Sequence, residues 1–185
     1  MRIAVYGGSF NPPHVAHGLV VSWLLSNGQV DEVWLVPVFG HAFEGVHQKR
    51  LAAFTDRVRW CRIMAEEAGP RVQVSEVEAM LPVPSFTIDT LEHLAAAHPD
   101  DDFRLVVGAD VLDQVGSWRD WSGIQARYAP IIVGREGHPP PQDVPVFPDI
   151  SSTEIRRRLA DGESIEGLVS PGVAVDLDQG CPWGG

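Results

Sequence analysis

The sequence predicts an α/β fold, a doubly wound parallel sheet with helices on both faces. Short apolar runs rich in β-branched residues recur at 3–6, 33–36, 72–74, 105–107 and 131–133. Longer segments with helical spacing separate them, among them 15–25, 54–65 and 87–97. Strands that alternate with helices form parallel sheets through right-handed crossovers. Several of these strands are nearly continuous apolar runs, which indicates that both faces of the sheet are covered.

The composition is that of one globular domain. The chain has 185 residues, 44% of them hydrophobic and 21% charged, which is enough for one substantial core. No Ser- or Gly-rich linker divides it, so we expect a single domain over residues 1–170. From Pro171 onward the chain turns to Gly, Asp and Pro, and we expect residues 171–185 to form an irregular tail.

Charge and hydropathy disfavour several classes of protein. The net charge of −11 argues against nucleic-acid binding, which depends largely on Lys and Arg. No apolar run approaches the roughly 20 residues that cross a bilayer, and no signal-peptide pattern precedes the first strand. We therefore expect a cytoplasmic protein without a membrane partner, which could form a homo-oligomer. Cys61 and Cys181 are too few for a disulfide framework or a Cys-rich zinc site, so we expect no metal ligands from this chain.

The connection after the first strand is the strongest candidate for a ligand site, because ligands bind beyond the carboxyl ends of such strands. Two glycines and two prolines in the stretch 7–13 would bring backbone N–H groups near a ligand and stiffen the entry to a helix. A helix start suits phosphate. His14 and His17 share one face of that helix. The alternatives are a turn followed by two surface histidines, or a zinc site, which lacks convincing partner ligands.

Two common phosphate motifs are missing from the chain. There is no Gly-x-x-x-x-Gly-Lys, because Lys49 follows Gln48, and no Gly-x-Gly-x-x-Gly opens the first helix. Both a P-loop phosphate hydrolase and an ordinary dinucleotide oxidoreductase are therefore disfavoured.

The stretch 150–159 begins with a capping box, which by itself indicates only the start of a helix. Three adjacent arginines follow. Successive helical residues point about 100° apart, so the three cannot all face one ligand. We expect Arg156 to turn inward beside the exposed N–H groups of Ser152 and Thr153, and the other two arginines to be solvated.

Two further stretches could contact a ligand. Asp110, which follows a predicted strand, could accept hydrogen bonds from a ribose or hold a metal-bound water, and an indole of Trp118 or Trp121 could stack on a flat ring. The alternative is a helix cap and two core tryptophans. The stretch 84–91 reads as a helix start whose N–H groups could receive a carboxylate, or simply as a cap.

Together these stretches resemble the bacterial nicotinate-nucleotide adenylyltransferases of the nucleotidyltransferase superfamily. Four elements match in order over about residues 1–165, namely 7–14 with His17, 84–91, 108–110 with Trp118, and 151–156. The first and last mark the superfamily, and the middle two are more particular to the pyridine-nucleotide branch. The resemblance implies a Rossmann-like nucleotidyltransferase fold.

The resemblance also implies an activity, the transfer of AMP from ATP to nicotinate mononucleotide with Mg²⁺. The products would be deamido-NAD and pyrophosphate, in NAD biosynthesis. A transferase for nicotinamide mononucleotide or another phosphorylated acceptor is a close alternative. A noncatalytic nucleotide-binding module is an alternative from another class.

The family pattern assigns roles to particular residues of this chain. The phosphates and the catalytic step would fall to His14, His17 and Arg156, and also to Lys49, which lies in a loop where the spacing differs from the family's. The rest of ATP would contact Gly8, Ser9, Phe10, Gly108, Asp110, Ser152 and Thr153. The mononucleotide would contact Thr87, Trp118 and Arg135. The chain departs from the pattern in the loop 37–49 and at Phe86, where tyrosine is common.

Overall fold

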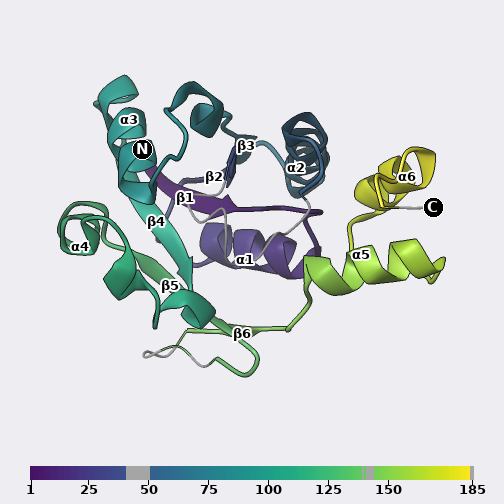
Figure 1. The fold of residues 1–185 in the computed structure, drawn as a ribbon. Coiled ribbons are helices and arrows are strands. Elements are labelled where there is room, and N and C mark those ends of the chain that lie inside the picture. The colour runs from purple at the N-terminus through teal and green to yellow at the C-terminus, as the bar shows by residue number, and fades with distance from the viewer. Residues whose placement is uncertain (41–50, 139, 141–143, 184–185) are drawn as a thin grey trace.

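Six parallel strands form one sheet in the computed structural model, which describes residues 1–40, 51–138, 140 and 144–183 (Figure 1). The strands are β1 (Arg2–Gly8), β2 (Glu32–Pro37), β3 (Val72–Val74), β4 (Asp102–Gly108), β5 (Ile131–Arg135) and β6 (Val146–Phe147). Their spatial order is β3-β2-β1-β4-β5-β6. The order reverses between β1 and β4, where doubly wound sheets bind ligands. The predicted fold class is confirmed.

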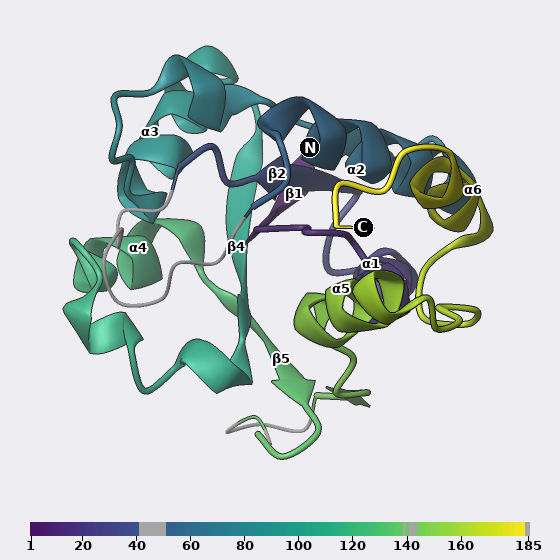
Figure 2. The same cartoon turned by 45° about the vertical axis from the view of Figure 1, so that its right-hand side comes forward.

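Helices cover both faces of this sheet (Figures 1 and 2). One face packs against α1 (Val15–Ser26) and α2 (Phe54–Ala68), and the other against α3 (Thr87–Ala97) and α4 (Trp121–Tyr128). Strand β1 shows why its sequence is apolar without alternation. Ala4 belongs to the core under α1 and α2, whereas Ile3 and Val5 belong to the core under α3 and α4. Both faces of the strand are buried, as the continuous apolar run predicts.

Three single-turn 3₁₀ segments and two further helices complete the described chain. The 3₁₀ segments span Val77–Met80, Ala109–Val111 and Val115–Ser117. Helix α5 (Ser152–Asp161) follows β6, and α6 (Pro171–Gln179) packs against α2. None of the helices in the described ranges is long and apolar enough to span a bilayer.

Helix α6 differs from the irregular tail expected after Pro171. Its Val173 and Leu177 are 0% exposed and pack with Trp60 and Ile155 in a third core cluster. Pro171 occupies the first turn, where proline favours a helix start. Val173 and Leu177 are four residues apart and form one apolar stripe. The expectation of irregular structure is therefore wrong for residues 171–179.

The buried stripe of α6 should contribute to the stability of the whole domain. Leu177→Ala is expected to lower the free energy of unfolding by about 2–5 kcal/mol, because it empties a fully buried site. Val175→Ala, at a residue 56% exposed on the same helix, should change it by less than about 0.5 kcal/mol. Urea denaturation of the two variants measures the difference. Equal midpoints would show that α6 is not part of the cooperative core.

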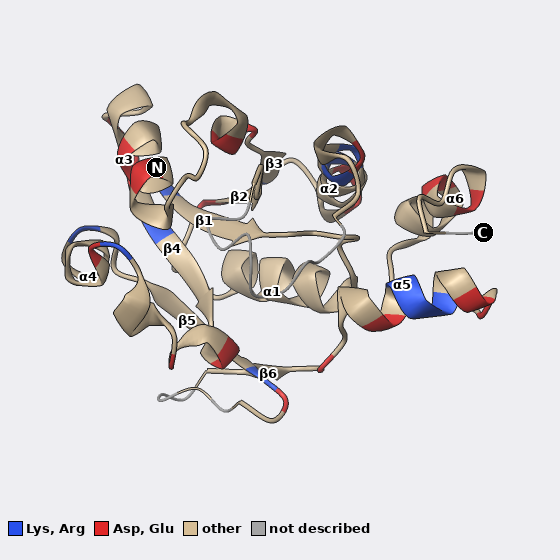
Figure 3. Ribbon diagram, in the orientation of Figure 1, with Lys and Arg blue, Asp and Glu red and all other residues tan. Residues whose placement is uncertain are grey.

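Charged residues are distributed over many elements (Figure 3). Basic positions in α2, α4 and α5 have acidic positions close by, and the contacts on α5 show the pattern. Arg157 pairs with Glu154, Asp161 and Glu163, at 2.8–2.9 Å. Much of the chain's limited positive charge is therefore neutralised locally by carboxylates.

Candidate active site

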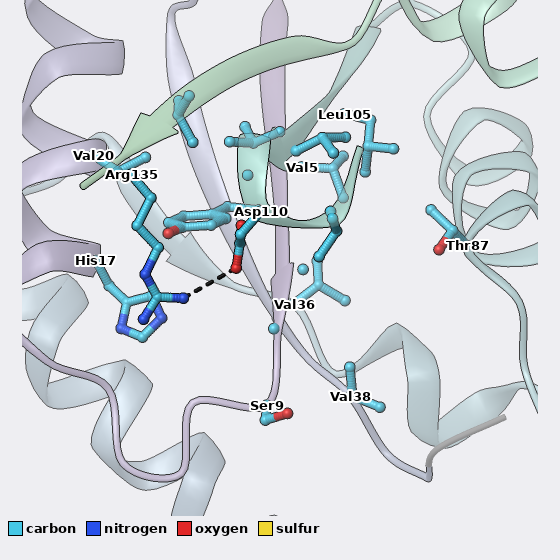
Figure 4. A pocket seen from close by; sticks show the side chains of 18 of the residues that line it. Val5, Ser9, His17, Val20, Val36, Val38, Thr87, Leu105, Asp110 and Arg135 are labelled. Atoms are coloured by element: carbon cyan, nitrogen blue, oxygen red, sulfur yellow. Dashed lines mark hydrogen bonds and ion pairs between the residues drawn. The ribbon is translucent and has the colours of Figure 1, made fainter. Parts of the chain in front are cut away.

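A cavity of about 600 Å³ lies at the carboxyl edge of the sheet, beside the point where strand order reverses. Its walls come from the ends of β1, β4 and β5 and from the starts of α1 and α3. Figure 4 shows His17 and Arg135 on one side of the cavity and Thr87 on the opposite side, with Val5 and Leu105 between them. The volume is in the range of small-molecule sites.

The loop after β1 forms one wall of the cavity. Phe10 adopts φ 44°, in the left-handed region, and its side chain is 1% exposed. Its ring packs against His17, with ring centroids 4.9 Å apart, and against Tyr6, at 5.8 Å. A Cβ on Gly8 would lie 3.2 Å from the Phe10 ring, closer than side chains normally approach. The loop therefore buries Phe10 as a support for His17 and needs a small residue at position 8.

His14 and His17 lie together at the start of α1. Their ring centroids are 3.7 Å apart, and the backbone N–H of His14 donates to Nδ1 of His17 at 3.1 Å. Because Nδ1 of His17 accepts this bond, the neutral ring carries its proton on Nε2. His14 is 7% exposed, and its Nδ1 is buried with no hydrogen-bond partner among the described residues. A buried nitrogen without a partner needs an explanation, and a bound ligand is one, since His14 lines the cavity.

Burial keeps both imidazoles uncharged at neutral pH. Burial and, to a smaller extent, nearby Arg135 lower the pKa of His14 to about 4, against an opposing effect of Asp149. Burial also holds the pKa of His17 well below its ordinary value, followed by the effects of His14 and Arg135. At pH 7 the pair therefore offers hydrogen bonds to an anion, and no positive charge.

The burial of His14 gives stability a pH dependence with a definite sign. Its folded pKa of about 4 lies below the unfolded value of about 6.5, so the unfolded chain binds the proton first as pH falls. Protonation of His14 in the unfolded chain should therefore lower the free energy of unfolding by about 3 kcal/mol between pH 7 and pH 4. In urea denaturation at both pH values, the free energy of unfolding should fall less for His14→Asn than for the parent protein. Equal losses would contradict the burial of His14.

Arg135 and Asp110 face each other across the cavity wall (Figure 4). Their side chains form an ion pair at 3.0 Å, and Arg135 also pairs with Asp149 at 2.8 Å. A Cβ built on Gly108 would collide with the carboxylate of Asp110. Glycine at position 108 therefore leaves the space in which Asp110 reaches Arg135.

The opposite wall is held by a buried carboxylate. Glu78 is 8% exposed and accepts hydrogen bonds from the hydroxyls of Ser85 and Thr90, both at 2.7 Å. These two bonds fix the first turn of α3, where Thr87 lines the cavity. Trp118 also lines this cavity and packs edge-on against Trp121, with ring centroids 5.7 Å apart.

Helix α5 contacts the loop after β1 from outside the cavity. The hydroxyl of Ser152 donates to the carbonyl of Pro12 at 2.8 Å, and Arg156 donates to the carbonyl of Asn11 at 2.8 Å. Arg156 also donates to the hydroxyl of Thr153 at 3.1 Å. Arg156 thus turns inward toward the loop and Thr153, as expected from the sequence.

Not every residue assigned from the sequence reaches the cavity. The described lining includes Gly8, Ser9, His14, His17, Thr87, Gly108, Asp110, Trp118 and Arg135. It does not include Phe10, which is buried within the loop, or the residues of α5, of which Ser152 and Arg156 contact the loop and Thr153 contacts Arg156. Lys49 lies outside the described residues.

The cytidylyltransferase-like family model matches residues 5–158 of the chain. A protein of Anaeromyxobacter sp. (strain K), named "Probable nicotinate-nucleotide adenylyltransferase", is 51% identical over 171 residues, which cover 91% of this chain and 89% of that protein. This chain belongs to the nicotinate-nucleotide adenylyltransferase family. A Myxococcus xanthus protein of the same name is 35% identical, with 91% and 87% of the two chains covered.

A solved member of the family shares the fold. The nicotinic acid mononucleotide adenylyltransferase of Plasmodium falciparum, complexed with NaAD, superposes with a TM-score of 0.79 over 98% of this chain and 97% of that chain. The two sequences are 21% identical. At this level of identity the similarity establishes the Rossmann-like nucleotidyltransferase architecture.

Two buried charged residues of this family member, Arg57 and Glu78, were not among those predicted from the sequence. A signal for the first was present in the sequence. Arg57 stands four residues before Cys61 and seven before Met64, on the buried stripe of α2. A charged side chain on an apolar stripe indicates a specific internal partner. Glu78 lies in a short 3₁₀ segment, where no periodicity marks it.

Proposed function

We propose that this chain transfers the adenylyl group of ATP to nicotinate mononucleotide and releases pyrophosphate. The observation that carries the proposal is a pair of neutral histidines that line the cavity. Figure 4 shows His17 on one wall and Thr87 on the opposite wall, and the ring centroid of His14 lies 3.7 Å from that of His17. The names of relatives such as the 51% identical Anaeromyxobacter protein support the same reaction.

The histidine side of the cavity suits the phosphates of ATP. The Nε2–H of His17 is available as a donor, because its Nδ1 already accepts from the His14 backbone. Nδ1 of His14 has no partner within the described part of the chain. Gly8 and Ser9 would bring backbone atoms close to the same phosphates. This arrangement would stabilise charge that develops on the leaving pyrophosphate.

The chemistry needs alignment more than proton transfer. The attacking group is a phosphate oxygen of the mononucleotide, which is already an anion, so no general base is required. It would attack the α-phosphorus of ATP as the bond to the β-phosphate oxygen breaks. Phosphoryl-type transfers of this kind depend on in-line positioning and charge stabilisation. Uncharged imidazoles fit this role, because no proton has to be removed.

The remaining lining residues would hold the two nucleosides. Gly108 and Asp110 would contact the adenosine part of ATP. Trp118 would stack on the nicotinate ring, and the backbone near Thr87 would receive its carboxylate. Arg135, which the structure pairs with two carboxylates, would contact the mononucleotide only after exchanging one of those partners.

Mg²⁺ would enter as a complex with the triphosphate. The described residues include no group of three or more His, Cys, Asp or Glu side chains arranged to hold a metal ion. Mg²⁺ usually keeps several waters and binds through substrate phosphates with one or two carboxylates. Asp110 lines the cavity but pairs with Arg135, so the phosphates and water would supply most of the ligands of the ion. The ion would supply charge neutralisation at the phosphates.

One assay tests the proposal directly. The purified protein is incubated with ATP, Mg²⁺ and one acceptor at a time, and pyrophosphate release is measured. We expect release with nicotinate mononucleotide and less with nicotinamide mononucleotide. A preference for nicotinamide mononucleotide would overturn the acceptor assignment. No release with any acceptor would overturn the transferase and leave a nucleotide-binding module.

A further inference from the structure

Arg57 of α2 is the one arginine in the described ranges that is fully buried, with 1% of its surface exposed. Its guanidinium donates to the carbonyl of Ser9 at 3.0 Å and to the carbonyl of Ala52 at 3.2 Å. It also lies 5.5 Å from the ring centroid of Phe54. All of these partners are neutral.

An uncompensated buried cation is costly, so its presence calls for an explanation. Burial lowers the pKa of Arg57, and no carboxylate of the described chain acts against this effect. Its neighbours on the same helix differ. Arg59 pairs with Asp56 and Asp176, and Arg62 pairs with Glu76. The described residues therefore provide no carboxylate as a counter-charge for Arg57, and a bound anion would fill that role.

The position of Arg57 indicates where that anion would bind. Ser9 lines the cavity and Arg57 does not, so the guanidinium holds the Ser9 carbonyl from outside the cavity. The Ser9–Phe10 peptide is trans, and a trans peptide directs its carbonyl and its N–H in opposite directions. The Phe10 N–H therefore points away from Arg57. The bond to Arg57 also keeps the Ser9 oxygen from facing a bound anion.

We propose that Arg57 is a positioning residue of the phosphate site, whose buried charge is neutralised by the phosphates of the bound nucleotide. Arg57 holds the Ser9–Phe10 peptide so that its N–H is available to an anion. The positive charge of Arg57 also raises the electrostatic potential on the other side of the loop, where the anion would bind. The inference rests on the proposed binding of ATP in this cavity. It adds a cation behind the loop to the uncharged histidines in front of it.

The test compares ATP with adenosine, because only ATP carries the phosphates. Affinities are measured by titration calorimetry without acceptor, on variants shown by circular dichroism to be folded. Arg57→Gln keeps hydrogen-bond donors and removes the charge, whereas Arg57→Lys keeps the charge. We expect the Gln variant to bind ATP about tenfold more weakly or worse, with adenosine affinity changed less than about twofold. The Lys variant should lose less than about threefold for ATP.

Arg62→Gln is the matched control, because it removes the same charge from the same helix at an exposed position. It should leave both affinities unchanged. Equal loss of ATP and adenosine affinity in folded Arg57→Gln would show a purely structural role and overturn the inference, as would unchanged ATP affinity. If Arg57→Gln does not fold, a tenfold fall in the ratio of ATP affinity to adenosine affinity in Arg57→Lys would overturn the inference. Absence of ATP binding by the parent protein would instead refute the proposed function.

Discussion

Replacement of His17 by alanine should lower kcat/KM for pyrophosphate release by about 10²–10³-fold, the usual effect of losing one preorganised donor. The Nε2–H of His17 is the donor whose orientation the structure fixes, through the bond from the His14 backbone to Nδ1. The same substitution removes that bond at the start of α1, which should cost about 1 kcal/mol of stability. Steady-state kinetics and urea denaturation of one preparation measure both effects.

Two further substitutions at this position separate catalysis from stability. The amide oxygen of Asn can replace Nδ1 as the acceptor for the His14 N–H, so His17→Asn should retain most of the stability and little of the activity. The amide nitrogen of Gln lies nearer the position of Nε2, so His17→Gln should retain more activity than His17→Asn. If all three variants lose activity only in proportion to unfolding, His17 is a packing residue.

Gly108→Ala should disrupt the other end of the site. The new Cβ would collide with the Asp110 carboxylate, which an ion pair with Arg135 holds in place at 3.0 Å. Asp110 must then leave Arg135 or the end of β4 must shift, at a cost of about 1–3 kcal/mol. Moving Asp110 or the end of β4 should misplace ATP and raise its KM at least about tenfold. Kinetics at saturating mononucleotide measures this change.

Gly116→Ala is the appropriate control for Gly108→Ala. Gly116 lies in the same connection after β4, and nothing stands within 4 Å of a Cβ at this position. The control should leave KM for ATP unchanged. If the two variants behave alike, the space beside Gly108 has no bearing on nucleotide binding.

The fold was predictable because its main signals are local. Each strand up to β5 coincides with a short segment rich in apolar residues, and β1 and β4 have residues in the cores on both faces. Helix α6 was not predicted because its segment is rich in Gly and Asp, which are typical of loops. Only two residues of the helix, Val173 and Leu177, are buried, and they form its apolar stripe. Periodicity over so short a segment is a weak signal.

The site was only partly predictable, because sequence spacing does not show which side of a loop a residue occupies. Motif positions identified His14 and His17 on the cavity wall and Arg156 beside the loop. They could not show that Phe10 turns into the core, since that depends on its left-handed backbone. Nor could they identify Arg57, whose contact with Ser9 joins residues 48 positions apart.

The contacts between α5 and the loop after β1 bear on how the protein matures during synthesis. Ser152 and Arg156 reach back across 140 and 145 positions to Pro12 and Asn11. Domains form during synthesis from the N-terminus onward. A nascent chain that ends at β6 would lack both of these donors, so we expect the loop after β1 to reach its final form only once α5 has been made.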